Sequence, residues 1–325
     1  MTNPLFSVII VCGHDADLLK RTLDALHVPD TYSHLEVLVL DNGGRSGREK
    51  VVNKAAESGL VIRYFSLPGI SKAAAWNTAV RESHADRLAF LDDDSVPAHD
   101  WLSAFETSLG DWNIGIVGGP DKAPKDSTIF QRCLDYALTS FIGTLGMRMG
   151  TERMGKYYPR PWNMAARKES IVIAGGFDEY FPEAPEVPLM RRMDQIGYRS
   201  TYQPDAFVWH RREADFPRFV RRDFRLSMER GRSAFQPGIG NVYSAAVLLI
   251  AATLVAGLGH IPGSRMLKPI VEAYLLVLGI SGIHAIFTAR TLAAILLVPL
   301  LLAAHHTAHI TGYIFGRLTE GFILR

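Results

Sequence analysis

Three consecutive aspartates, Asp92, Asp93 and Asp94, directly follow the apolar run Leu88–Leu91. Two carboxylates spaced i, i+2 on an extended segment point to the same side, so Asp92 and Asp94 converge while Asp93 faces away. Adjacent like charges are costly unless a cation or another partner occupies the gap. Hard oxygen ligands with an incomplete protein shell suit Mg²⁺ or Mn²⁺ that holds a diphosphate. The segment therefore predicts a divalent-metal site, and a plain turn is the alternative.

A cation at this place would neutralise the charge that builds on a nucleoside diphosphate leaving group. The sequence contains no GxxxxGK[ST] motif, which disfavours ATP hydrolysis by a P-loop. Its two cysteines, Cys12 and Cys133, lie far apart without CxxC or histidine-rich spacing, so we expect core thiols rather than a disulfide framework or a zinc site.

Strand patterns alternate with helix patterns in the first third of the chain. The predicted strands are Phe6–Cys12, Leu35–Leu40, Val61–Phe65 and Leu88–Leu91, and the predicted helices are Leu18–Leu26, Lys50–Ser58 and Ser71–Ser83. This alternation predicts an α/β fold with a mostly parallel sheet. Ligands of such sheets bind beyond the carboxyl ends of the strands, where both Asp41 and the three aspartates are expected.

Charge is unevenly distributed along the chain. Only seven charged residues fall in the last 85 positions, while the first 240 residues hold 30 basic and 31 acidic side chains. That near-neutral balance argues against a nucleic-acid partner. The charge-free runs Val242–Ile261, Ala273–Ala289 and Thr291–Gly316 predict about three transmembrane helices. The alternative is a set of buried helices in a soluble domain.

The segment Asp215–Arg232 has apolar residues at helical spacing and arginines on the other face, with eight arginines between Arg211 and Arg232. It predicts a helix in the headgroup layer on the cytoplasmic side. An ordinary surface helix, or arginines that contact a pyrophosphate, would give the same pattern. The N-terminus has no basic region before its apolar run, so we expect no secretory signal and a cytoplasmic main domain. The expected organisation is a main domain over 1–214, an interfacial segment over 215–237 and a membrane domain over 238–325, in the inner (plasma) membrane.

Seven segments in order resemble the family 2 glycosyltransferases, which have the GT-A fold. They are SVIIV, LEVLVLDNGG, GISKAAAWNTAV, RLAFLDDDSVP, NMAARKES, AGGFDEYF and EVPLMRRMDQIGY, and they cover about residues 6 to 210. The resemblance implies a Rossmann-like catalytic domain, here followed by membrane helices. It also implies a nucleotide-diphosphate sugar as the donor.

The family's functional positions can be carried over to matching residues. The aspartate that contacts the nucleobase matches Asp41, and the DxD motif for metal and donor diphosphate matches Asp92 and Asp94. The resemblance thus assigns Asp41, Asn77, Asp92 and Asp93 to the donor. His210 resembles a histidine that some members add to the metal shell, so the implied metal ligands are Asp92, Asp94 and His210.

The resemblance places the catalytic base at Glu186, where relatives have the aspartate of a Glu-Asp pair, with Glu183 as the alternate. A further departure is Trp76, which stands where relatives have an arginine that could meet the donor. Trp162 and Asn163 are expected in an acceptor cleft. The implied mechanism is a single in-line displacement that inverts the anomeric configuration.

Because the tail predicts membrane anchoring, the expected acceptor is a lipid-linked or envelope saccharide. A different class of function is a catalytically inactive, membrane-bound protein that binds a nucleotide sugar or a lipid, motivated by the departures at Glu186 and Trp76. A sugar nucleotidyltransferase is the third class, and the sequence lacks its glycine-rich triphosphate loop near the N-terminus.

Overall fold

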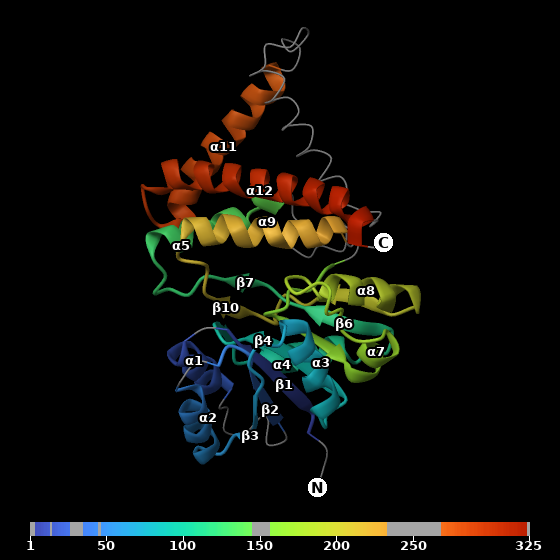
Figure 1. Ribbon diagram of the computed structural model, residues 1–325. Helices are drawn as coiled ribbons and strands as arrows, with labels where there is room; N and C mark the ends of the chain where they lie inside the picture. The colour runs from blue at the N-terminus through green and yellow to red at the C-terminus, as the bar shows by residue number, and fades with distance from the viewer. Residues whose placement is uncertain are drawn as a thin grey trace. The chain divides into compact units, whose positions relative to one another are not determined.

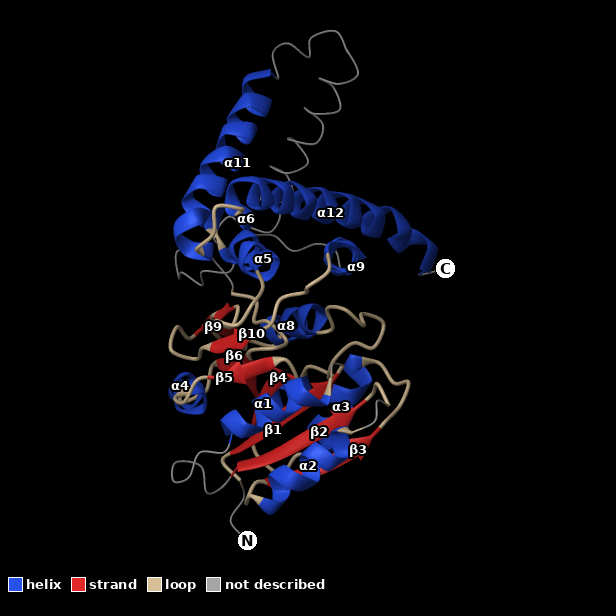
Figure 2. Cartoon of the chain, turned by 90° about the vertical axis from the view of Figure 1, so that its left-hand side faces the viewer, coloured by secondary structure: helices blue, strands red, loops and turns tan. Residues whose placement is uncertain are grey.

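The computed structural model describes residues 4–13, 15–26, 35–44, 47–144, 157–232 and 268–323. The chain forms two compact units (Figures 1 and 2). The first contains Met1–Lys122 and Lys156–His210, and the second contains Ala123–Gly155 and Arg211–Arg325. The predicted membrane segment Val242–Ile261 lies outside the described residues.

A seven-stranded sheet forms the centre of the first unit, in the order β3-β2-β1-β4-β8-β6-β9. Its strands are β1 (Phe6–Cys12), β2 (Leu35–Asp41), β3 (Val61–Ser66), β4 (Arg87–Asp92), β6 (Ile114–Gly118), β8 (Met164–Arg167) and β9 (Arg199–Tyr202). Among these strands only β8 runs antiparallel to its neighbours. The predicted α/β fold with a mostly parallel sheet is confirmed.

Helices cover both faces of this sheet. They are α1 (Ala16–Leu26), α2 (Arg48–Glu57), α3 (Lys72–Glu82), α4 (Trp101–Ser108), α7 (Lys168–Ile173) and α8 (Glu186–Gln195). Alternate residues of the fully buried β1 enter two different core clusters: Val8 and Ile10 pack with α1 and α4, while Ile9 and Val11 pack with α3 and α8. This burial on both faces explains why β1 reads as a continuous apolar run.

A second, three-stranded sheet has the order β5-β10-β7, with β5 (Ser95–Pro97), β7 (Asp121–Lys122) and β10 (Val208–His210). His210 pairs with Ser95 in the antiparallel register of β10 and β5. Val208 pairs with Asp121 in the parallel register of β10 and β7. The small sheet thereby brings His210 to the chain that directly follows the three aspartates.

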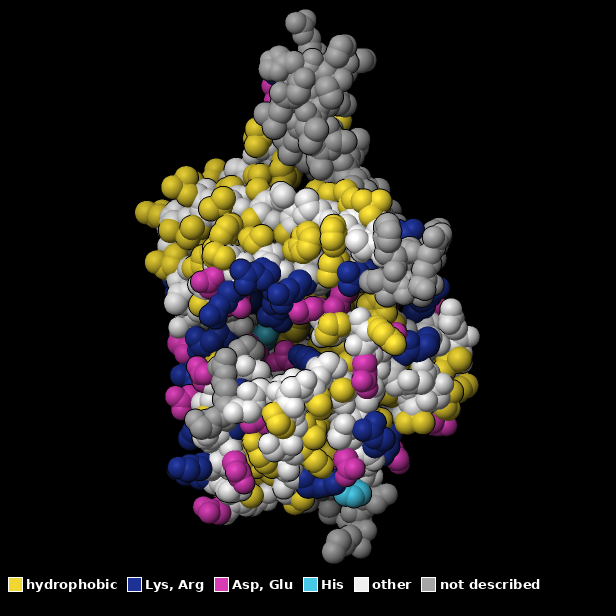
Figure 3. All heavy atoms as spheres, viewed as in Figure 1, with side chains coloured by type: hydrophobic (Ala, Val, Ile, Leu, Met, Phe, Trp, Pro, Cys, Tyr) yellow, Lys and Arg dark blue, Asp and Glu magenta, His cyan; other side chains and the backbone are white. Residues whose placement is uncertain are grey.

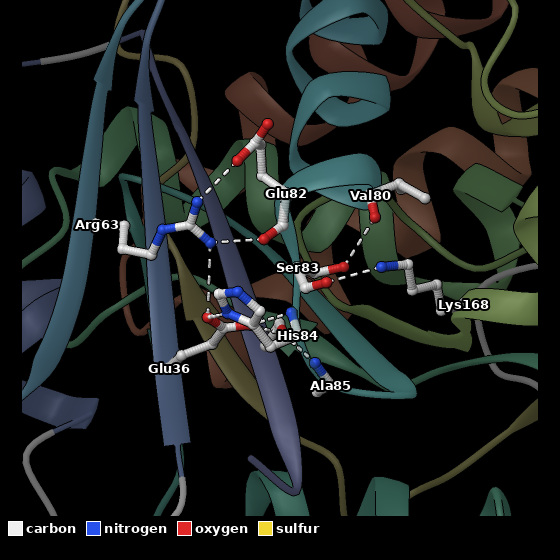
Figure 4. A network of polar contacts seen from close by, with 9 residues as sticks. Glu36, Arg63, Val80, Glu82, Ser83, His84, Ala85 and Lys168 are labelled. Atoms are coloured by element: carbon white, nitrogen blue, oxygen red, sulfur yellow. Dashed lines mark hydrogen bonds and ion pairs between the residues drawn. The ribbon is translucent and has the colours of Figure 1, made fainter. Parts of the chain in front are cut away.

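A polar network fixes the turn between α3 and β4 (Figure 4). The buried carboxylate of Glu36 accepts hydrogen bonds from Ser7 Oγ and from the backbone N–H of His84, the latter at 2.5 Å. Arg63 donates to the side chain of Glu82 at 2.7 Å. Because β4 begins just after this turn, the network anchors the strand whose other end is Asp92.

The described part of the second unit is helical, with α5 (Ile129–Thr139), α6 (Phe141–Thr144), α9 (Phe216–Arg232), α11 (Lys268–Ala289) and α12 (Ala294–Ile323). Residues of α5, α9, α11 and α12 share one hydrophobic core. By length and composition, α11 and the part of α12 over Ala294–Thr319 could cross a membrane. The helix α9 matches the predicted amphipathic segment.

Candidate metal centre and active site

Asp92, Asp94 and His210 form a buried group at the end of β4 and β10. Their ligand atoms all lie within 4.8 Å of one another, and His210 Nε2 is 3.4 Å from Asp94 Oδ1. Ligands of Mg²⁺ lie about 2.1 Å from the ion, so two of them are at most about 4.2 Å apart. The three side chains therefore fit a hard divalent cation after closing by less than about 1 Å.

The backbone of the aspartate segment is held by Thr22 of α1. Its hydroxyl lies 3.1 Å from the Asp93 carbonyl oxygen and 3.0 Å from that of Ser95. Asp93 is fully buried and is not part of the group formed by Asp92 and Asp94. Thr22 thus helps to fix the turn between β4 and β5 that presents these two carboxylates.

Both ring nitrogens of His210 face a carboxylate. Nε2 lies near Asp94, while Nδ1 lies 3.8 Å from Asp121 Oδ2. The ring stacks on Trp162 with centroids 4.5 Å apart and planes 15° apart. A carboxylate behind a ligating histidine selects its tautomer and orientation. Sequence reasoning missed Asp121, since only the pairing of β7 with β10 brings it here.

Lys72, the first residue of α3, is a second residue that the sequence analysis missed. Its ammonium donates a hydrogen bond to Asp92 Oδ1 and lies 5.0 Å from the centre of the Trp76 ring. Lys72 thus places a positive charge one helical turn before Trp76. The i, i+4 spacing of Lys72 and Trp76 was the signal that could have indicated it.

Trp76 itself is buried in an aromatic group with Phe90 and Phe177, at ring distances of 5.7 and 4.8 Å. Beside it, Asn77 Oδ1 accepts from the Phe177 backbone N–H at 2.8 Å, and Asn77 Nδ2 donates to the Phe177 carbonyl at 2.9 Å and to Glu179 Oε1 at 3.1 Å. These contacts tie α3 to the loop 175–179. The structure places Asn77 as an anchor of that loop.

Asp41 lies buried at the end of β2, where its carboxylate organises the following loop. Oδ1 accepts from the backbone N–H groups of Gly43 and Gly44 and from the guanidinium of Arg48. Oδ2 accepts from the Tyr64 hydroxyl at 2.8 Å, and burial together with this hydrogen bond raises the pKa of Tyr64. Asp41 therefore fixes the conformation of the loop that follows β2 through hydrogen bonds to its backbone.

Glu186 is the first residue of α8 and is buried, whereas Glu183 is half-buried in the preceding loop. The structure thus gives Glu186 a fixed helical position rather than that of a solvated loop carboxylate. The expectation that Asn163 lines an acceptor cleft is wrong. Its fully buried amide accepts from Trp101 Nε1 at 2.7 Å and donates to the Pro120 and Ala206 carbonyls, so it joins segments of the core.

Comparisons with known proteins agree with this architecture. The chain is 26% identical over 231 residues to glycosyltransferase AglE of Haloferax volcanii, covering 69% of this chain and 72% of AglE. It is 23% identical over 202 residues to the succinoglycan biosynthesis protein ExoA of Rhizobium meliloti, covering 61% of each chain. The second match thus spans less than two thirds of its relative.

A mannosyltransferase from Pyrobaculum calidifontis, solved with GDP-mannose and Mn²⁺, has a similar fold. The TM-score is 0.59 at 19% identity, covering 100% of this chain and 89% of the other. This likeness identifies the fold as GT-A. The sequence model of glycosyl transferase family 2 matches residues 7–215, more than half of the chain, and this protein therefore belongs to that family.

Proposed function

We propose that this protein is an inverting glycosyltransferase that moves a sugar from a nucleotide-diphosphate sugar to a lipid-linked or saccharide acceptor at a membrane. The observation that supports it most directly is the buried group of Asp92, Asp94 and His210. A membrane-anchored enzyme meets a lipid-linked acceptor at high local concentration, which favours that class of acceptor. The proposed location is the inner membrane, with the catalytic unit on the cytoplasmic side.

On the donor side, Asp92, Asp94 and His210 would hold Mg²⁺ or Mn²⁺, whose charge stabilises the departing diphosphate. Lys72 provides a positive charge from the chain itself, beside Asp92. It can turn from this carboxylate toward a bound diphosphate because its side chain is flexible. Asp93 supports this site from within the core.

Asp41 and Asn77 complete the proposed donor site through the loops that they hold. Asp41 organises the loop at Asn42–Gly44, which we assign to the nucleobase. Asn77 fixes the loop 175–179 against α3. The two residues then act by presenting backbone and neighbouring side chains in a constant geometry, which is how a preorganised site gains affinity.

Glu186 is the proposed base, with Glu183 as the alternate. It removes the proton from an acceptor hydroxyl, and the resulting oxygen nucleophile attacks the anomeric carbon opposite the leaving diphosphate. The bond from that carbon to the diphosphate oxygen breaks as the new glycosidic bond forms, so the configuration inverts. The proton stays on the Glu186 carboxyl until it exchanges with water.

The test is a panel of nucleotide sugars offered to the detergent-solubilised full chain with Mg²⁺ or Mn²⁺. We expect one donor to bind only with metal, Asp94→Asn to abolish that binding, and Glu186→Gln to keep binding while losing turnover. A product with the anomeric configuration of the donor would contradict the inverting mechanism. Retained turnover in Glu186→Gln together with loss in Glu183→Gln would transfer the base role to Glu183.

A catalytically inactive nucleotide-sugar-binding protein is the second candidate, favoured by Pro185 and Glu186 at the position of the family's Glu-Asp pair. The same panel separates the two functions. Metal-dependent binding without hydrolysis or transfer, even with lipid acceptors present, would establish the binding protein and exclude the transferase.

A further inference from the structure

The helices α9 and α12 run in the same direction and stay in contact over several turns. Asp223 Oδ2 lies 2.7 Å from His305 Nδ1, and Ser227 Oγ lies 2.8 Å from His309 Nδ1. At the carboxyl ends, Arg232 Nε donates to Thr319 Oγ1 at 3.4 Å. Figure 1 shows the two helices as a stacked pair. Their axes are therefore coupled over most of α9.

Glycines bring the two backbones unusually close. A Cβ atom added at Gly316 would lie 2.0 Å from the Met228 carbonyl oxygen, and one at Gly312 would lie 2.4 Å from that of Phe224. On α9, a Cβ at Gly231 would lie 2.3 Å from the Tyr313 carbonyl oxygen. Real Cβ atoms essentially never approach that closely. Neither helix can change its tilt without the other following.

The face of α12 that meets protein contains buried histidines in addition to the apolar residues, such as Leu301 and Leu302, that it contributes to the shared core. His305, His306 and His309 are buried, and each shares a hydrogen bond with a neighbouring helix, His306 with the Tyr274 hydroxyl of α11 at 2.9 Å. The covered face of α12 therefore includes hydrogen-bonded polar groups, while large apolar side chains of the same helix stay exposed.

The exposed face of α12 carries a stripe of uncharged, mostly apolar side chains at helical spacing. Its members are Leu296, Leu300, Thr307, Thr311, Ile314 and Leu318. Leu296 and Leu318, at opposite ends of the stripe, are 79% and 70% exposed. The Thr311 hydroxyl donates to the Thr307 carbonyl at 2.8 Å, so it needs no water. The whole stripe is thus compatible with lipid.

The face of α9 that points away from α12 has the opposite character. Arg218, Arg221 and Arg225 are exposed at intervals of three and four residues, so they lie along one side of the helix. Figure 3 shows basic side chains gathered beside the hydrophobic side chains of the C-terminal helices. The pair α9–α12 therefore has one cationic and one apolar surface, both parallel to the helix axes.

The boundary between the cationic and the apolar surface runs along the helix axes, and this direction distinguishes two membrane arrangements. A helix that crosses a bilayer has polar ends and an apolar middle, so its boundaries cut across the axis. A helix that lies in the interface has its boundary along the axis. If α12 crossed, the coupled α9 would carry its exposed arginines into hydrocarbon, which is costly.

We propose that α12 lies in the plane of one leaflet rather than crossing it. Its stripe from Leu296 to Leu318 is immersed in acyl chains, and the exposed arginines of α9 lie at the level of anionic phosphates. The partner is thus the surface of an anionic bilayer. The proposal replaces the predicted transmembrane segment Thr291–Gly316 with an interfacial one, and it rests on the membrane association in the proposed function.

The test measures the depth of three positions on the stripe. Single cysteines at Leu296, Thr307 and Leu318 of the full chain are labelled with a nitroxide, and the protein is reconstituted in vesicles of phosphatidylcholine and phosphatidylglycerol. We expect equal depths at all three positions. Leu296 and Leu318 are 22 residue steps apart, about 33 Å along a helix, so a crossing helix would place them on opposite sides and Thr307 deepest. That result would overturn the proposal.

A cysteine at Arg221 is the matched control on the other face of the pair, and we expect its label to be shallower than those on α12. Cys12 and Cys133 are buried, so the unsubstituted protein gives the labelling background. Sedimentation with the vesicles reports membrane association separately from depth, and sugar transfer reports the enzyme. Failure to sediment would overturn both the association and the in-plane arrangement, whereas a depth gradient with normal sedimentation would overturn the arrangement alone.

The proposed preference for anionic lipid is tested with Arg218→Gln and Arg221→Gln. One basic residue near an anionic surface is worth about 1 kcal/mol, so each change should weaken binding to these vesicles about fivefold. Binding to vesicles of phosphatidylcholine alone should not change. Equal affinity of the wild type for both kinds of vesicle would contradict the role of the arginines.

Discussion

The ammonium of Lys72 contacts the carboxylate of Asp92 and at the same time lies over the ring of Trp76. This places a positive charge of the chain itself beside a proposed metal ligand. The tryptophan, four residues further along α3, supports the lysine by a cation–π contact. Position 76 therefore stabilises a cation in this protein instead of supplying one.

Replacing Lys72 by Met should separate metal affinity from donor affinity. Without the ammonium, Asp92 is freed from its ion pair, so the metal concentration for half-maximal activity should fall. The donor KM should rise roughly 10- to 150-fold, because a charge-assisted hydrogen bond of about 1.5–3 kcal/mol is lost. Metal and donor titrations of initial rates measure both. Lys20→Met, which removes an exposed ion pair with Asp24, is the control. A parallel loss of both affinities would contradict this role.

Asp121→Asn should weaken metal binding although Asp121 is outside the ligand group. The change removes the negative charge that faces His210 Nδ1. Partners behind metal ligands typically contribute about 10- to 100-fold in affinity, and we expect a loss in that range. Direct Mn²⁺ binding, followed by electron paramagnetic resonance, measures it without turnover. Asp126→Asn, at an exposed ion pair with Arg211, should leave Mn²⁺ affinity unchanged. Equal affinities of wild type and Asp121→Asn would remove Asp121 from the site.

Asn77→Ala should release the loop 175–179. Three hydrogen bonds to Phe177 and Glu179 are lost, and partners left unpaired cost about 1–3 kcal/mol each, less where water replaces the amide. Hydrogen exchange should accelerate at the Phe177 amide, and transfer should slow with it. Asn113→Ala, which removes a hydrogen bond to exposed Asp111, serves as the control. Unchanged protection at Phe177 would show that the aromatic group alone holds the loop.

Glu36 should make the stability of the first unit sensitive to acid. Burial opposes ionisation, but hydrogen bonds from Ser7 and His84 outweigh it and hold the pKa of Glu36 below its usual value. A lowered pKa stabilises the fold above the unfolded value of about 4.3, and this contribution is lost as pH falls through the folded pKa. Melting temperatures from pH 7 downward should therefore fall more steeply in the wild type than in Glu36→Gln. Glu106→Gln, a half-exposed acid paired with Arg87, should follow the wild type. Parallel curves for Glu36→Gln and wild type would refute the assignment.

Gly316→Ala should separate α12 from α9. The added methyl group would meet the Met228 carbonyl oxygen, so the helices must move apart and the hydrogen bond of Asp223 to His305 should lengthen. Overpacking of this kind costs about 1–3 kcal/mol, and we expect a lower melting temperature in detergent. Gly279→Ala on α11 is a matched control with open space around the glycine, and helix propensity should make it neutral or stabilising. A Gly316→Ala protein as stable as wild type would show that the pair tolerates separation.

Local patterns were sufficient to predict the first half of the sheet. They also predicted that Asp92 and Asp94, two members of the buried group with His210, lie together. The strand β1 has the predicted bounds, and β2, β3 and β4 differ by one or two residues at their ends. Asp92 ends β4 and Asp94 lies two residues further along, so their convergence depends only on neighbouring backbone. His210 was placed by resemblance, and the structure brings it to them through β10.

What the sequence could not indicate depends on pairing between distant segments. Asp121 reaches His210 only through the register of β7 with β10, and Asn163 is buried because it bridges three separate stretches of core. Likewise, the histidines of α12 look like interruptions of an apolar run until their partners on α9 and α11 are known. Hydropathy averages over all faces of a helix, whereas membrane topology depends on which face is covered.

The pairing of α9 with α12 also has a consequence for biosynthesis. A ribosome that adds about 5–20 residues per second finishes α12 roughly 5–20 seconds after α9 has been made. Throughout that delay, Asp223, Ser227 and Gly231 have no α12 to cover them. Water must satisfy Asp223 and Ser227 until then. A chain that stopped before α12 would therefore keep every proposed metal ligand but lack the partner that α9 packs against.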